Sequence, residues 1–311
     1  MAVPRLGFGG ASLGNLYRQV SDADAHATLS AAWDAGIRMY DTAPHYGLGL
    51  SERRIGAFLS SQPRDDYLIS TKVGRVLVAD PDFGGRRDVD NGFDVPADHV
   101  RVFDPSADGI RRSLDGSLNR LGVDRVDILY LHDPDAYDLD LGLADGLPAL
   151  AALRDEGLVD LIGIGTNSAA AATRAVREHD IDLVMIAGRY TLLDRDAATE
   201  LLPLCVERGV GVVAVGVYNS GLLATEVPGG TFNYQPASND VVARAQRLAQ
   251  LCADFDVALP TAALQFPLRH PAVVAELIAM SSADHLRETM ARFAVDVPEQ
   301  LWARLDEGAM V

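Results

Sequence analysis

The sequence predicts an α/β protein whose strands and helices alternate and close into a single (β/α)8 TIM barrel over residues 1–311. Eight short apolar runs rich in β-branched residues are each followed by an amphipathic stretch. The alternation continues through all 311 residues without a break in composition. Runs of this kind indicate parallel strands buried on both faces. Polar residues of several types also follow the runs, as at the active rim of such a barrel. A doubly wound sheet is the alternative.

Periodicity and turn signals give the expected elements. The strands are expected at residues 4–10, 37–40, 67–71, 126–131, 161–165, 182–188, 210–217 and 273–280. The helices are expected at 22–33, from 51 onward, and at 106–121, 145–157, 168–179, 195–208, 239–255 and 283–293.

The longest connection, residues 73–105, is expected to form a lid or one wall of a substrate site. It is rich in glycine and aspartate, and a connection of this length in a compact domain usually has a function. Its side chains suited to contacting a polyol are Phe83, Phe93, Arg86, Arg87 and His99.

Composition excludes several classes of function. The formal net charge of −17 repels phosphate backbones, so no nucleic-acid partner is expected. No apolar run reaches the roughly 18 residues of a membrane span, and the first residues lack a secretory pattern. The two cysteines, Cys205 and Cys252, are expected to be buried thiols in a reducing cytoplasm.

Three local segments match the motifs of other functions only in part. Gly10-Ala-Ser12-Leu-Gly14 matches the nucleophile pattern of serine hydrolases, but a polar loop rather than a helix follows it. The glycines of residues 7–10 do not complete a dinucleotide fingerprint. The acidic run Asp133, Asp135, Asp138 and Asp140 lacks the glycine and glutamate of a calcium loop, so a solvated loop is expected there. No metal site is expected from the histidines.

Four side chains near the strand ends suggest acid–base chemistry. Asp41, Lys72 and His132 each follow an apolar run, and Tyr46 lies five residues after Asp41. A phenol has a pKa of about 10, and a neighbouring ammonium lowers it. Lys72 supplies that ammonium, Asp41 holds Lys72, and His132 orients a substrate oxygen. These groups move a proton at a carbonyl or carbinol oxygen but cannot carry hydride, which indicates a nicotinamide cofactor.

The chain resembles the aldo-keto reductase family over essentially its whole length. The segments that carry the likeness are Gly36-Ile-Arg-Met-Tyr-Asp41-Thr-Ala-Pro-His-Tyr46-Gly, Ser70-Thr-Lys72-Val-Gly and Leu131-His132-Asp-Pro. The resemblance implies the (β/α)8 barrel and a catalytic tetrad of Asp41, Tyr46, Lys72 and His132, with Tyr46 as general acid/base. It also implies that Asn167 holds the nicotinamide carboxamide beside Thr166.

A narrower likeness points to the branch that contains L-fucose or D-threo-aldose 1-dehydrogenase and, nearby, pyridoxal 4-dehydrogenase. It rests on HYGLGLSERRIGAFL, VDILYLHDPD, VYNSGLLA and ALQFPLRHP. It implies oxidation of an aldose at C1 to the lactone. The alternatives are pyridoxal oxidation, general aldehyde or ketone reduction, and a non-catalytic regulatory subunit that binds the cofactor.

The cofactor site departs from the family pattern. Ala187 and Val215 stand where many relatives have a glutamine and a stacking tyrosine, and Val217, Asn219 and Ser220 are candidates for contacts near the pyrophosphate. Ser281 stands where relatives place a basic residue for the 2′-phosphate of NADP. NAD is therefore the expected cofactor, with NADP as the alternative. The residues expected around this end are Ser281, Ser282, His285 and Arg287.

Overall fold

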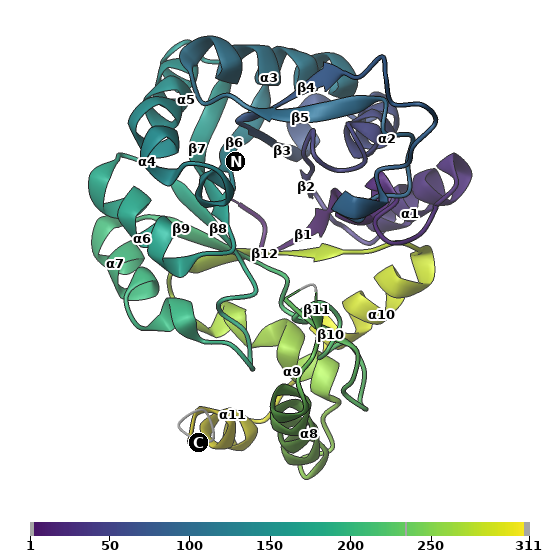
Figure 1. Cartoon of the computed structure of the whole chain (residues 1–311). Coiled ribbons are helices and arrows are strands. Elements are labelled where there is room, and N and C mark those ends of the chain that lie inside the picture. The colour runs from purple at the N-terminus through teal and green to yellow at the C-terminus, as the bar shows by residue number, and fades with distance from the viewer. Residues whose placement is uncertain (1–2, 234, 308–311) are drawn as a thin grey trace.

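The computed structural model describes residues 3–233 and 235–307 and contains the predicted barrel. Its strands close in the order β1-β12-β9-β8-β7-β6-β3-β2, and every neighbouring pair is parallel (Figure 1). The barrel strands are β1 (Leu6–Gly9), β2 (Met39–Asp41), β3 (Leu68–Val73), β6 (Val126–His132), β7 (Val159–Thr166), β8 (Leu183–Ala187), β9 (Gly211–Val215) and β12 (Val273–Ala279). Each expected apolar run overlaps one of them, and β2, β3, β6 and β7 extend beyond their runs.

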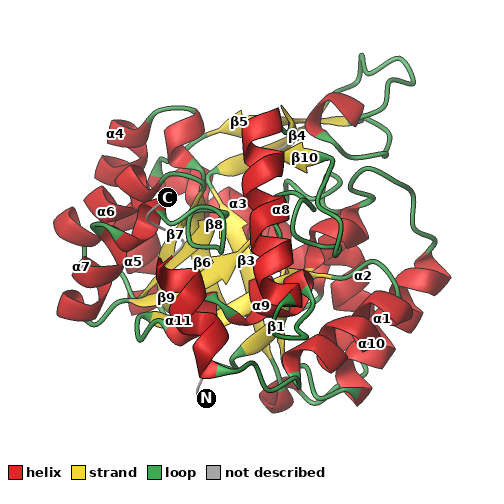
Figure 2. Ribbon diagram, turned by 90° about the horizontal axis from the view of Figure 1, so that it is seen from below, coloured by secondary structure: helices red, strands yellow, loops and turns green. Residues whose placement is uncertain are grey.

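Helices surround the barrel (Figure 2). They are α1 (Asp22–Asp34), α2 (Leu50–Leu59), α3 (Ala107–Leu121), α4 (Leu139–Leu141), α5 (Leu147–Asp155), α6 (Ala169–Glu178), α7 (Leu201–Arg208), α8 (Asn239–Ala253), α9 (Leu259–Gln265), α10 (Ala283–Phe293) and α11 (Glu299–Glu307). Serine side chains accept a backbone N–H at the starts of several helices, including Ser21, Ser106, Ser168, Ser238 and Ser282. These caps explain why the helices begin where polar loops end.

Three features of the helical layer differ from expectation. Helix α9 was not predicted because six of its seven residues are buried, so it has no polar face to create a helical period. Helix α7 begins at Leu201 rather than at residue 195, since residues Asp196–Ala198 form a separate short 3-10 turn. Helix α11 also lies beyond the expected elements.

Alternation along the strands places polar side chains at one end of the barrel interior. Met39, Leu68, Ile128 and Tyr130 belong to the cluster of buried residues that fills the barrel. Side chains two residues apart on a strand share a face. Asp41 follows Met39 by two residues, Lys72 follows Leu68 by four, and His132 follows Tyr130 by two. These three polar groups therefore form the last layer above an apolar interior.

The connection at residues 73–105 is not an irregular loop. Residues of β4 (Arg75–Ala79) pair in antiparallel register with β5 (His99–Phe103), and the tip between them contains a 3-10 turn at Val89–Asn91. A second small hairpin joins β10 (Thr231–Phe232) to β11 (Gln235–Pro236). Alternating exposed and half-buried residues in β5 indicate that one face of the first hairpin covers the barrel mouth.

Both cysteines are buried as expected, and burial raises the pKa of each thiol to about 12. Within residues 3–233 and 235–307, no helix is both long and apolar enough to cross a membrane. No group of three or more His, Cys, Asp or Glu side chains in these ranges is arranged to hold a metal ion.

Candidate active site

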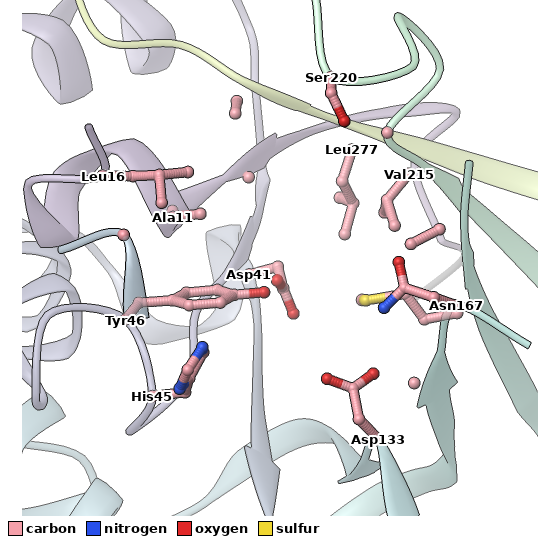
Figure 3. A pocket seen from close by; sticks show the side chains of 18 of the residues that line it. Ala11, Leu16, Asp41, His45, Tyr46, Asp133, Asn167, Val215, Ser220 and Leu277 are labelled. Atoms are coloured by element: carbon pink, nitrogen blue, oxygen red, sulfur yellow. The ribbon is translucent and has the colours of Figure 1, made fainter. Parts of the chain in front are cut away.

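A pocket of about 780 Å³ opens at the carboxyl ends of the barrel strands (Figure 3). All eight barrel strands, or the residues directly after them, contribute to its inner wall, and the 3-10 turn of the 73–105 connection adds an outer wall. The inner residues include Gly9, Gly10, Ala11, Asp41, Lys72, His132, Asp133, Gly165, Thr166, Asn167, Ala187, Val215, Val217, Leu277 and Ala279. The outer residues include Val89, Asp90, Asn91, Gly92 and Phe93.

Lys72 and Asp41 form a buried ion pair at the base of the pocket. Lys72 Nζ lies 2.6 Å from Asp41 Oδ2, and the two side chains are 2% and 5% exposed. Ser70 donates to Asp41 Oδ1 at 2.8 Å, and Lys72 also donates to the Thr42 carbonyl at 2.9 Å. Burial lowers the pKa of Lys72, but Asp41 and then Tyr46 outweigh it and raise that pKa above its usual value. Lys72 is therefore held as a fixed ammonium ion.

Tyr46 lies directly over this ammonium. Lys72 Nζ is 4.7 Å from the centroid of the Tyr46 ring, and the turn that carries Tyr46 precedes α2. Burial raises the pKa of Tyr46, and Lys72 acts against that shift. The expected lowering by the ammonium is therefore present, but burial outweighs it in the protein alone. A positive charge in the pocket would favour the phenolate further.

His132 faces Tyr46 across the pocket and is a neutral imidazole. The two ring centroids are 6.0 Å apart with the planes near perpendicular. Burial, followed by the nearby Arg75 and Lys72 charges, holds the pKa of His132 well below its usual range. Its Nδ1 is buried without a hydrogen-bond partner among the described residues, while Nε2 lies 3.4 Å from Asp133 Oδ2. A proton on Nε2 leaves Nδ1 as the unpaired acceptor, which costs less than an orphaned donor.

Two further pocket residues were missed by sequence reasoning. Asp133 was expected in a solvated acidic loop, but its side chain is only 20% exposed and pairs with Arg75 at 2.5 Å. His45 packs edge-on against Phe93 and His132, and burial together with Arg75, Arg101 and Lys72 lowers its pKa to about 2. The available signal was adjacency, because both residues are chain neighbours of a tetrad residue.

The expected nicotinamide contacts divide into two groups. Thr166, Asn167, Val217 and Ser220 line the pocket, and Figure 3 shows the Asn167 amide and the Ser220 side chain pointing toward it. Asn219 is not among the lining residues. Its amide oxygen accepts from Thr191 Oγ1 at 2.7 Å and its amide nitrogen donates to the Gly188 carbonyl at 3.3 Å. The expectation for Asn219 is therefore corrected: its side chain joins two loops.

The residues expected near the 2′ position lie at the start of α10. Ser282 caps this helix by accepting from the His285 N–H, and Arg287 is paired with Asp284. Ser281 Oγ accepts from Arg18 Nη2 at 2.5 Å and lies 3.1 Å from His285 Nδ1. Arg18 comes from the loop before α1, so the sequence around Ser281 gave no sign of this cation.

Contacts in the structure also show where the side chains of the 73–105 connection and Ser12 lie. Of the five side chains proposed in the 73–105 connection, Phe93 lines the pocket, whereas Arg86 and Arg87 pair with Asp80 and Asp94. Ser12, the hydrolase candidate, donates to the Met280 carbonyl at 2.8 Å and is not a pocket residue.

Asp41, Tyr46, Lys72 and His132, the four residues expected to form a catalytic tetrad, therefore lie together in one pocket. The family model described as the aldo/keto reductase family matches residues 5–309. The chain belongs to this family and is an oxidoreductase.

Two relatives and one solved structure are similar to this chain over most of its length. The chain is 50% identical to a D-threo-aldose 1-dehydrogenase from a Pseudomonas species, with 100% of this chain and 95% of that protein covered. It is 38% identical to pyridoxal 4-dehydrogenase from Microbacterium luteolum, with the same coverage of each chain. The solved holo form of an aldo-keto reductase from Bacillus halodurans superposes with a TM-score of 0.76 at 26% identity, covering 98% of this chain and 91% of that one.

Proposed function

We propose that this protein oxidises an aldose at C1 to the lactone with a nicotinamide cofactor. The observation that carries the proposal is the buried Lys72–Asp41 pair beneath Tyr46, opposite a neutral His132. The similarity to a D-threo-aldose 1-dehydrogenase supports an aldose as substrate.

In this proposal Tyr46 is the general base for oxidation. Its phenolate takes the proton of the anomeric hydroxyl, and Lys72 stabilises the phenolate charge from 4.7 Å. Asp41 keeps Lys72 in place. The Nε2–H of His132 donates to the same substrate oxygen and fixes its orientation. When bound, a nicotinamide cofactor would supply the acceptor for the hydride from C1. In the reverse direction Tyr46 is the acid.

The residues present fit a nicotinamide cofactor. The pocket volume of about 780 Å³ lies within the usual range for ligand sites. The Asn167 amide offers a donor and an acceptor to a carboxamide, and a Cβ at Gly221 would meet only open space, which leaves room along this wall. Asn167, Thr166, Val217 and Ser220 would hold the cofactor.

We propose that NAD is preferred over NADP. Tight NADP sites use arginine or lysine at the 2′-phosphate, and this chain has Ser281 at the expected position. Arg287 is already paired with Asp284. Arg18 donates a hydrogen bond to Ser281. NADP is the alternative cofactor because the Arg18 guanidinium would lie close enough to pair with a 2′-phosphate at this position.

Three alternative functions have less support than aldose oxidation. Pyridoxal oxidation follows from the similarity at 38% identity, and aldehyde or ketone reduction follows from the same acid–base groups run in reverse. A regulatory role without turnover would not require the buried ion pair. A cytoplasmic location stays a prediction.

A spectrophotometric panel tests the function. Nicotinamide reduction is followed with L-fucose, D-arabinose, L-galactose and pyridoxal, and the product is identified as a lactone by mass spectrometry. We expect the highest kcat/KM with an aldose. Absence of turnover with every aldose would contradict the proposal, and a higher kcat/KM with pyridoxal would favour the second candidate.

A further inference from the structure

Asp133 has a left-handed backbone conformation. It directly follows β6 and has φ of 42°, in the left-handed region that non-glycine residues seldom occupy. Asp133 lines the pocket, and Figure 3 shows its carboxylate directed into the space between Tyr46 and Asn167. A strained backbone that turns a charge toward an active site suggests a role for that charge in the site.

The two carboxylate oxygens of Asp133 have different surroundings. Oδ2 accepts from Arg75 Nη2 at 2.5 Å and lies 3.4 Å from His132 Nε2. Among the described residues, no hydrogen-bond donor is recorded for Oδ1. Arg75 is itself buried and comes from β4, so it fixes the orientation of the carboxylate. Burial raises the pKa of Asp133, and the Arg75 charge acts against that shift. The side chain thus presents one oriented acceptor to the pocket.

The position of this acceptor relative to the reacting atoms follows from His132. In the proposed function, His132 Nε2 and Tyr46 hold the oxygen on C1. In a sugar, the oxygen on C2 lies within hydrogen-bond distance of the oxygen on C1. Asp133 lies one hydrogen-bond length beyond His132 Nε2. The C2 hydroxyl is therefore brought to the side of the pocket where the Asp133 carboxylate lies.

We propose that Asp133 is a specificity-determining residue that accepts a hydrogen bond from the substrate hydroxyl next to the reacting carbon. This inference deepens the proposed function and takes its substrate pose from it. The site then selects 2-hydroxy substrates, because only they provide a donor to this carboxylate, whose side chain is 20% exposed. A hydrogen bond to a charged group is strong enough to change kcat/KM by about 10- to 100-fold.

The test compares one aldose with its 2-deoxy and 2-O-methyl analogues, in the wild type and in Asp133→Asn. We expect the wild type to prefer the 2-hydroxy sugar by about 10- to 100-fold over both analogues, since neither can donate. The Asn variant should lose most of this preference, so its ratio of kcat/KM for the 2-hydroxy sugar to kcat/KM for the 2-deoxy sugar should fall toward one. Asp140→Asn is the matched control, because Asp140 is an exposed carboxylate in the same connection that pairs with Arg174.

Two results would overturn the inference. One is equal kcat/KM of the wild type for the 2-hydroxy and 2-deoxy sugars, which needs no variant and is independent of folding. The other is an equal loss by Asp133→Asn on all three sugars, which would mean that Asp133 acts only by positioning His132. Cofactor binding measured by fluorescence titration shows whether the variant is folded.

A second substrate series separates this inference from the proposed function. If no aldose is oxidised, reduction of lactaldehyde is compared with reduction of propanal, which lacks the 2-hydroxyl. A preference for lactaldehyde that disappears in Asp133→Asn would support the role of Asp133 even though the aldose proposal has failed. Equal kcat/KM for the two aldehydes would overturn it.

Discussion

Replacing Lys72 by methionine should destabilise the protein and should do so in a pH-dependent manner. The substitution leaves the Asp41 carboxyl 5% exposed with Ser70 as its hydrogen-bond donor. Burial already raises the pKa of Asp41, and Lys72 is the main group that counteracts this shift. Without Lys72, the folded-state pKa of Asp41 rises further above the unfolded value, so the buried carboxyl takes up a proton.

The size of the effect follows from the cost of that proton. The unfolded chain has an aspartate pKa of about 3.9, so protonating Asp41 at pH 7 costs about 1.4 kcal/mol for each pH unit above that value. The free energy of unfolding can therefore fall by at most about 4 kcal/mol through this proton. Measurements on other buried pairs that lost one partner give about 3–5 kcal/mol. The sign is fixed because a raised acid pKa is unfavourable only above the unfolded pKa. The loss should therefore be about 1.5 kcal/mol at pH 5 and grow toward pH 7.

Urea unfolding of Lys72→Met from pH 5 to pH 7 measures this dependence, and the double variant Asp41→Asn/Lys72→Met is the control. The double variant removes both charges, so more than half of the lost stability at pH 7 should return. Oxidation should remain lost in both variants, because the phenolate of Tyr46 has no ammonium beside it. A loss of stability that is independent of pH, or a double variant as unstable as the single one, would refute the reasoning.

Three other predictions concern activity and cofactor use. Tyr46→Phe should lower kcat by about 10²- to 10⁴-fold with unchanged cofactor affinity in a fluorescence titration, and retention of more than about a tenth of the rate would contradict the assignment. The rate of oxidation should rise with pH through the alkaline range, because phenolate is the base and burial raises the pKa of Tyr46, while reduction should fall over the same range. A flat profile would exclude this base. Arg18→Gln should weaken binding of NADP but not of NAD, with Arg287→Gln as control, and Ser281→Arg should strengthen NADP binding; equal effects on both cofactors would place the 2′ position elsewhere.

The barrel and the rim positions of Asp41, Lys72 and His132 were predictable because both depend on local pattern. A strand buried on both faces is a short apolar run, and a polar residue directly after it lies at the carboxyl end of the barrel. Such reasoning needs no knowledge of which segments meet in space. It also identified Thr166 and Asn167 at the end of β7.

The rest of the site depends on contacts between distant segments. Asp133 looked solvated because the residue that pairs with it, Arg75, is 58 positions away in a connection that showed no strand pattern. Ser281 is approached by Arg18 from 263 positions away. Asn219 has the composition of a ligand contact, but a tertiary hydrogen bond with Thr191 uses its amide. These pairings join segments far apart in the sequence, so the residues next to each partner do not predict them.

The hairpin of β4 and β5 limits how this enzyme can be re-engineered or can diverge. Arg75 in β4 pairs with Asp133, and Arg101 in β5 donates to the His45 carbonyl and pairs with Asp88. The two stems are therefore part of the barrel's catalytic end, although they belong to an insertion. Only the tip between the stems, residues 80–98, is a module that can be exchanged between homologues, and the exchange must keep Asp88 as the partner of Arg101. Variation in substrate range within such a lineage should accumulate in that tip, while the stems change only together with the barrel residues they hold.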